Sequence, residues 1–175
     1  MKFKAFVASV ALSLTGVSAL AAAPSCTSTA AWGSLGTPGF EAFGNAFSSA
    51  NSYTDCYTFS LSGTAKVLGG AIEINTLFNR LSIDILSVSL YLGNALLGSD
   101  TSPLSFSFVG LSGGSGYTLA IASSVTKGPG LLTLPVGYAG SLTTIAAPVP
   151  ELGAVALTIA GILGVGAFAW RRKKA

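Results

Sequence analysis

The chain contains no histidine, only two cysteines, and only nine basic and six acidic side chains among its 175 residues. The lack of histidine excludes Ser-His-Asp catalysis, Cys-His nucleophile activation and imidazole metal ligation. Two cysteines without histidine also make a poor zinc set. We therefore predict no catalytic residues of these kinds, no metal site and no cofactor.

Positive charge is scarce except at the two ends of the chain. Six of the nine cations lie there: Lys2, Lys4, Arg171, Arg172, Lys173 and Lys174. Between residues 22 and 150, three bases stand against five acids, which gives a formal charge of −2. Because this portion has no basic patch, we predict that nucleic acid is not a partner.

The few carboxylates offer little evidence for an enzyme. Two of them would suit a glycosidase acid and nucleophile, but nothing in their spacing singles out a pair. The simpler interpretation is that they are solvated charges that keep the domain soluble. The five are Glu41, Asp55, Glu73, Asp84 and Asp100.

The first residues have the pattern of a secretory signal peptide. Lys2 and Lys4 precede an apolar stretch that reaches about residue 17, and small residues follow. The stretch is short for a membrane span, and Ala19-Leu20-Ala21 fits a processing site. We predict that residues 1–21 form the signal peptide, with cleavage one or two residues later, or an uncleaved anchor, as alternatives.

If the chain is exported, its two cysteines are expected to form a disulfide. In an oxidising compartment an even count favours a disulfide over free thiols, so we predict a Cys26–Cys56 bridge. Closing a loop of about 30 residues stabilises the fold by about 3 to 4 kcal/mol in the chain-entropy model.

Residues 22–147 carry short alternating segments separated by glycine and serine. Residues 57–61 alternate between apolar and polar, as in a half-buried strand. Residues 81–92 also alternate, but the phase slips by one residue after Ile85, which predicts a β-bulge. A helix through residues 77–92 is the alternative, but the serine-rich and β-branched content favours a strand.

Three further segments complete the predicted fold. Residues 104–108 and 117–121 flank a glycine-rich turn and are predicted to form a hairpin. Residues 131–138 and 141–145 are predicted to be the last strands. Short strands at this spacing predict an all-β domain, an antiparallel β-sandwich.

The aromatic residues of this domain permit two interpretations. Phe40, Phe43 and Phe47 recur at roughly helical spacing, and five tyrosines are scattered along the chain. Phenylalanine and tyrosine are ordinary core residues, and this is the simpler interpretation. Exposed on one face of a sandwich, they would instead suit sugar stacking in a glycan-binding module.

Residues 148–175 have the composition of a membrane anchor. Residues 152–170 are nineteen residues without a charge, and a helix of this length covers about 28 Å, close to one hydrocarbon core. Four cations follow at once: Arg171, Arg172, Lys173 and Lys174. We predict a transmembrane helix at residues 152–170 in a lipid bilayer, with the basic tail (residues 171–174) in the cytoplasm and the sandwich outside.

A short polar motif, an apolar helix and a basic end resemble the PEP-CTERM sorting signal of Gram-negative surface proteins. Val149, Pro150 and Glu151 match three positions of the Val-Pro-Glu-Pro signature, and Leu152 stands in the place of the second proline. The resemblance implies that an exosortase, a transpeptidase-like membrane protease, cleaves at this motif and releases the domain.

A second stretch resembles the PEP-CTERM subgroup named for its Phe-x-Asp-x-Tyr signature. Tyr53, Asp55 and Tyr57 occupy the three named positions, with tyrosine in place of phenylalanine. No activity is implied. The physical interpretation that we prefer is an Asp55 that caps a turn and aromatics that pack at the entrance of a strand.

Together these observations predict an exported, non-enzymatic protein of the cell surface or extracellular matrix, associated with exopolysaccharide or biofilm. A single-pass membrane intermediate precedes its release. The alternatives are a glycan-binding module and, third, an envelope hydrolase with two carboxylates in one cleft.

Overall fold

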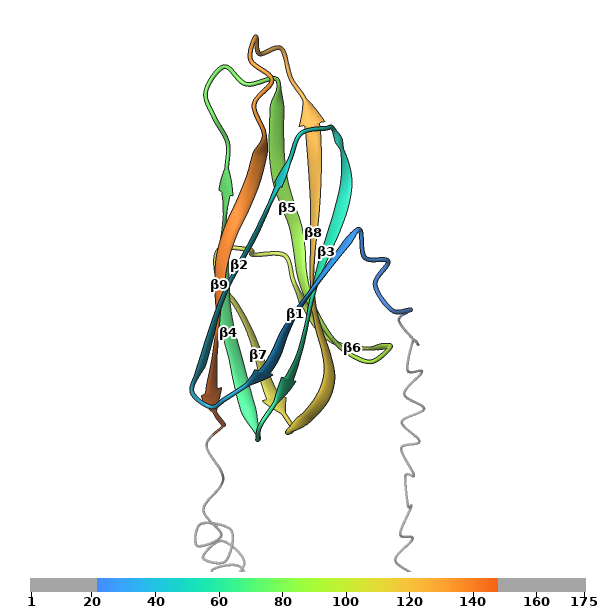
Figure 1. Ribbon diagram of the computed structural model, residues 1–175, viewed down its shortest axis with the longest axis vertical. Coiled ribbons are helices and arrows are strands. Elements are labelled where there is room, and N and C mark those ends of the chain that lie inside the picture. Colours follow the sequence, from blue (N-terminus) through green and yellow to red (C-terminus); the bar gives the residue numbers. More distant parts are fainter. Residues whose placement is uncertain (1–21, 148–175) are drawn as a thin grey trace, which may run out of the picture.

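Two β-sheets lie face to face in the computed structural model, and their strands run along the long axis of the molecule (Figure 1). The structure describes residues 22–147. The predicted signal peptide and the predicted sorting signal at residues 148–175 lie outside these residues. Within the described part, no helix has the length and apolar character needed to cross a membrane.

One sheet has five strands in the order β1-β3-β8-β5-β6, and the other has four in the order β2-β9-β4-β7. Their bounds are β1 Ser28–Leu35, β2 Gly39–Phe47, β3 Asn51–Leu61, β4 Ala65–Ile74, β5 Leu81–Leu92, β6 Ala95–Asp100, β7 Phe106–Leu111, β8 Gly114–Lys127 and β9 Val136–Ala146. The predicted all-β sandwich is confirmed at this level. One feature differs from the prediction, because β1 pairs with β3 in parallel, whereas the other neighbours are antiparallel.

The predicted bulge in β5 is present. Ile85 pairs with Ser123 and Ser87 with Ala122, so Leu86 has no partner on β8 and is exposed. The extra residue resets the alternation, and Val88 and Leu90 return to the interior. Without this bulge, the second half of β5 would turn its polar face toward the core.

Two other predictions for this domain are wrong. Residues 104–108 and 117–121 do not form a hairpin, because β7 pairs with β4 in one sheet and β8 pairs with β3 and β5 in the other. The glycine-rich turn therefore crosses between the sheets. The last strand of the described residues is β9, one long strand in place of the two predicted, and residues 131–135 lie in the connection before it.

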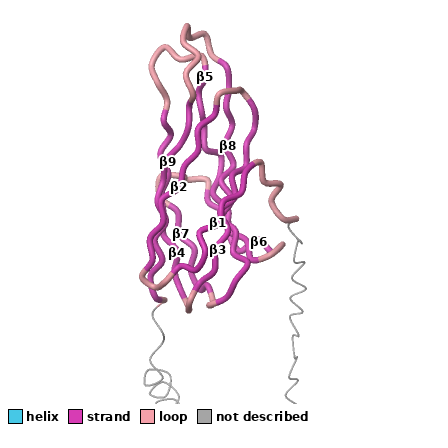
Figure 2. The backbone as a smooth tube through the Cα atoms, in the orientation of Figure 1, coloured by secondary structure: helices cyan, strands magenta, loops and turns pink. Residues whose placement is uncertain are grey.

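The hydrophobic core of the described residues lies between the two sheets. Its members run from Leu35 to Leu142, and aromatic rings from β2, β3, β7, β8 and β9 form much of it. Figure 2 shows the strands of the two sheets as two groups, with β2, β4, β7 and β9 in one and β1, β3, β5, β6 and β8 in the other. Residues 22–147 contain a hydrophobic core, two sheets and a disulfide, which are the contacts on which an autonomous folding unit depends.

Glycine at position 140 lets an aromatic ring lie against the backbone of β9. A Cβ atom placed there would overlap the ring of Phe43 and the carbonyl oxygen of Gly70 on the neighbouring strand. Neither group can move freely, since Phe43 is buried among other rings and Gly70 belongs to the sheet. The absence of a Cβ at Gly140 therefore leaves the space that the Phe43 ring occupies against β9.

We expect Gly140→Ala to lower the free energy of unfolding by about 1 to 3 kcal/mol, because the added methyl overpacks the core. The measurement is urea unfolding of residues 22–147, produced in an oxidising compartment. Gly63→Ala is the matched control, since a Cβ at Gly63 meets no atom within 4 Å. Equal stabilities of the two variants would contradict the packing role of Gly140.

Candidate functional site

Strand β3 carries all three residues of the Phe-x-Asp-x-Tyr resemblance, and the pleat turns all of them inward. Tyr53, Asp55 and Tyr57 alternate with Thr54 and Cys56, which face the other side of the sheet. Asp55 is 1% exposed in the middle of the strand. The prediction that it caps a turn is therefore wrong.

The carboxylate of Asp55 is the centre of a buried polar network. Its Oδ1 accepts hydrogen bonds from Ser28 Oγ and from Asn45 Nδ2, the latter at 3.0 Å, and its Oδ2 accepts one from Tyr138 Oη. The donors come from β1, β2 and β9, so both sheets contribute. Three neutral donors compensate the loss of water around a buried carboxylate.

Two tyrosines extend the network on the side of the four-stranded sheet. The hydroxyl oxygens of Tyr57 and Tyr138 are 3.2 Å apart, and Tyr57 Oη donates to the carbonyl oxygen of Gly44 at 3.3 Å. Burial raises the pKa of Tyr138 well above its usual range, and the hydrogen bond to Asp55 raises it further. Burial also raises the pKa of Tyr57. Both phenols therefore keep their protons and act as donors.

Aromatic rings pack over the two tyrosines of the signature, Tyr53 and Tyr57. Trp32 stacks on Tyr57 with ring centroids 4.8 Å apart, and Phe47 stacks on Tyr53 at 4.2 Å. The signature residues thus act structurally, joining strands of both sheets through a polar centre and its aromatic surroundings. Sequence reasoning missed Ser28, Trp32, Asn45 and Tyr138, because they are spread over β1, β2 and β9 and share no local motif.

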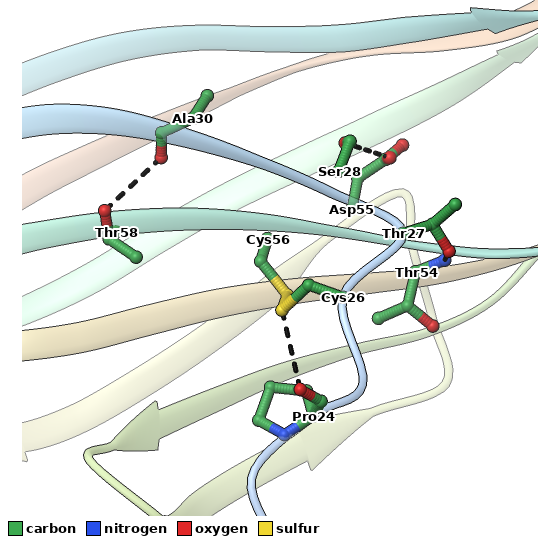
Figure 3. The surroundings of a disulfide bond; sticks show 9 residues. All are labelled: Pro24, Cys26, Thr27, Ser28, Ala30, Thr54, Asp55, Cys56 and Thr58. Atoms are coloured by element: carbon green, nitrogen blue, oxygen red, sulfur yellow. Dashed lines mark hydrogen bonds between the residues drawn. A yellow bond between two sulfur atoms is a disulfide. The ribbon is translucent and has the colours of Figure 1, made fainter.

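The predicted disulfide between Cys26 and Cys56 is confirmed, with Cα atoms 5.7 Å apart (Figure 3). Cys56 lies on the outward side of β3, and Cys26 lies just before β1. Beside the bridge, Thr27 N donates to Thr54 O at 2.7 Å, and Thr54 N donates to Thr27 Oγ1 at 3.0 Å. The bridge therefore ties the start of the parallel edge strand to the sheet.

The two exposed phenylalanines of residues 22–147 do not lie together. Phe43 and Phe47 are buried, as the core interpretation predicts. The exposed phenylalanines are Phe40, at the start of β2, and Phe78, in the β4–β5 connection. They lie at opposite ends of the sandwich, because Phe40 pairs with the end of β9 and Phe78 contacts the connection that precedes β9.

The carboxylates do not gather into a metal-ligand cluster in the part of the chain that the structure describes. Glu73 Oε1 accepts a hydrogen bond from Ile85 N at 2.7 Å, and Asp100 Oδ1 accepts one from Ser102 N at 2.8 Å. The remaining predicted site residues lie outside the described range: Val149, Pro150, Glu151, Arg171, Arg172, Lys173 and Lys174.

Comparison with known proteins does not assign a family. No protein-family model matches the chain, and no curated protein matches it. Among solved structures, it is similar to PliG of Aeromonas hydrophila, a periplasmic lysozyme inhibitor of g-type lysozyme. The identity is 9%, over 66% of this chain and 99% of that chain, and the TM-score is 0.35. A likeness at this level does not establish a common fold.

Reduction of the disulfide is expected to loosen β1 before the rest of the sandwich. A bridge that closes a loop of about 30 residues contributes about 3 to 4 kcal/mol, and β1 is a largely exposed edge strand. In the Cys26→Ser/Cys56→Ser variant, amide hydrogen exchange should accelerate in β1 far more than in β8.

The presence of the bridge in the native host can be tested by alkylation. Protein exported by its native host should show no alkylatable thiol before reduction. Two free thiols in that protein would contradict a native bridge.

Tyr138→Phe is expected to lower the free energy of unfolding at neutral pH by about 1 to 3 kcal/mol, because Asp55 Oδ2 loses its donor. The wild type should also lose stability at alkaline pH. The folded-state pKa of Tyr138 is raised, so its stabilising contribution is complete below about pH 10 and declines above it, where the tyrosine of the unfolded chain ionises.

The decline of the free energy of unfolding at alkaline pH distinguishes Tyr138→Phe from a control variant outside the network. Urea unfolding at several pH values between neutral and about pH 11 should show a shallower decline in Tyr138→Phe than in the wild type. Tyr91→Phe is the control, because Tyr91 is half-buried on the outward face of β5. If Tyr138→Phe and Tyr91→Phe have the same alkaline slope as the wild type, Asp55 and Tyr138 are not coupled as described.

Proposed function

We propose that this chain is an exported, non-enzymatic protein of the cell surface or extracellular matrix, sorted by an exosortase through a PEP-CTERM signal. The observation that carries the proposal is the order of three parts at the C-terminus. Val149-Pro150-Glu151 precedes nineteen uncharged residues, and four cations follow them. The released domain then associates with exopolysaccharide in the matrix.

The disulfide supports export. Bridges of this kind form and persist in oxidising compartments outside the cytoplasm, which is where a signal peptide at residues 1–21 directs a chain. The single-pass intermediate would keep the sandwich on the outer side of the inner membrane.

The position of the motif relative to the last strand also supports sorting. Strand β9 ends at Ala146, and the motif begins three residues later at Val149. Cleavage at the motif would therefore remove the membrane segment and leave the whole sandwich and its disulfide intact. Pro150 lacks an N–H and restricts the backbone before it to extended conformations, while Glu151 offers a charge that a protease can pair with.

Two properties of the sandwich support a matrix role without catalysis. Asp55, the buried carboxylate, is engaged by donors from three strands that hold the fold together. The outward side of the five-stranded sheet is rich in hydroxyl groups, which suit hydrogen bonds to hydrated polysaccharide. These outward residues include Thr54, Thr58, Ser60, Ser82, Ser89, Ser99, Thr118, Ser124 and Thr126.

Glu151→Ala is expected to block C-terminal processing and leave membrane insertion unchanged, because the apolar span and the basic tail stay intact. Pulse-labelling in the native host should show the variant at its unprocessed length while the wild type shortens. Asp84→Ala is the matched control, since it removes an exposed carboxylate from β5 and should be processed normally.

Deletion of residues 171–174 should act differently, by weakening the cytoplasmic stop so that the span slips through the membrane. If Glu151→Ala shortens as fast as the wild type, the motif is not read by a protease and the segment is an ordinary membrane anchor.

A further inference from the structure

One end of the sandwich exposes a cluster of large apolar side chains, which we name the apolar tip. It comprises residues 75–80, between β4 and β5, and residues 128–135, between β8 and β9. Leu131 is 91% exposed, Leu77 84% and Phe78 78%, and Leu132 and Leu134 are about half exposed. Figure 1 shows these two connections projecting together beyond the sheets, at the end opposite to the last residues of β9.

Hydrogen bonds hold the two connections of the apolar tip in one arrangement. Leu131 N and Leu132 N both donate to Phe78 O, and Arg80 N donates to Leu132 O. The side chain of Asn79 donates to Leu134 O at 2.8 Å and accepts from Leu134 N at 3.0 Å. The apolar side chains are therefore presented by a braced pair of loops.

The backbone at the centre of the apolar tip is strained. Phe78 has a φ of +64°, in the left-handed region that a bulky side chain rarely adopts. In the isolated domain, Phe78 is unfavourable for two reasons: its backbone is strained and its apolar ring is exposed to water. Such a residue points to a partner that covers the ring.

The charge around the apolar tip indicates the chemistry of that partner. Arg80 and Lys127 line a hollow of about 210 Å³, and the other lining residues are Leu81, Ser48, Ser49 and Thr133. Arg80 and Lys127 are two of the three basic residues in the described part of the chain, and the connections at this end, 48–50, 75–80 and 128–135, contain no carboxylate. Cations and hydroxyl donors suit a phosphate headgroup.

We propose that the apolar tip docks onto a bilayer that contains anionic phospholipid. Leu77, Phe78 and Leu131 enter the boundary between headgroups and acyl chains, while Arg80 and Lys127 pair with headgroup phosphates. Binding to a membrane surface without spanning it grows with the apolar area buried at the headgroup boundary and with the attraction of cations to anionic lipid, and this end of the sandwich offers both. The contact lies at the end opposite to the C-terminal end of β9, so it does not depend on residues 152–170 or on sorting.

The test is co-sedimentation of residues 22–147 with vesicles of phosphatidylcholine alone or with added phosphatidylglycerol. The wild type should bind the anionic vesicles, and binding should weaken as salt rises. The variant Arg80→Gln/Lys127→Gln should bind anionic vesicles about tenfold or more weakly. Each cation near such a surface raises the affinity roughly fivefold. Lys66→Gln, on β4 away from the apolar tip, should bind as the wild type does.

Apolar variants separate insertion from simple charge attraction. Phe78→Gly should fold at least as well, because glycine adopts positive φ without strain, yet it should bind several-fold more weakly because the ring is lost. Phe78→Ser/Leu131→Ser should weaken binding about tenfold or more. The matched control is Phe40→Ser/Leu104→Ser, which removes two exposed apolar side chains elsewhere and should leave binding unchanged.

Two results would overturn the proposal. One is equal vesicle binding by the variants of the apolar tip and by the control variants, with every variant showing a wild-type unfolding transition. The other is self-association without vesicles, measured by light scattering and abolished by Phe78→Ser/Leu131→Ser, with no binding to anionic vesicles. In that case the apolar tip is covered by a second copy of the chain.

Discussion

The rest of the structure depends on one buried carboxylate, that of Asp55. A charge inside a sandwich is tolerated only when hydrogen-bond donors replace its water, and here they come from β1, β2 and β9. Losing any of these strands would leave the carboxylate short of a partner. The network therefore specifies which strands meet at the centre of the domain, a role that apolar packing alone fulfils less selectively.

The same centre explains how a parallel edge strand is retained in an otherwise antiparallel sandwich. Strand β1 offers mostly exposed side chains, so apolar burial holds it weakly. Its attachment comes from Ser28 bonded to Asp55, from Trp32 stacked on Tyr57, and from the disulfide just before its first residue. The covalent bridge and the polar network thus act on neighbouring residues of β3 and secure one edge of the sheet.

The two ends of the sandwich differ in chemistry, and each is linked to a different proposed function: sorting at one end and membrane contact at the other. At one end β9 stops three residues before the motif of the proposed sorting signal. At the other end, strained and braced loops expose leucine and phenylalanine beside Arg80 and Lys127. A released domain would keep the second end, since its residues all belong to the sandwich.

Features that depend on neighbouring residues could be predicted from the sequence alone: the alternation in β3 and β5, the bulge after Ile85, and a disulfide that only one pair of cysteines can form. Other features depend on contacts between residues that are far apart in the chain. Residues 104–121 resemble a hairpin locally, but the two sheets pair β7 and β8 with other strands. In the sequence, Asp55 has the character of a turn residue. In the structure it accepts hydrogen bonds from residues 10 to 83 positions away, and no local pattern predicts these partners. The apolar tip could not be predicted from the sequence either, because leucine and phenylalanine occur both in cores and on surfaces, and the sequence does not show which are exposed.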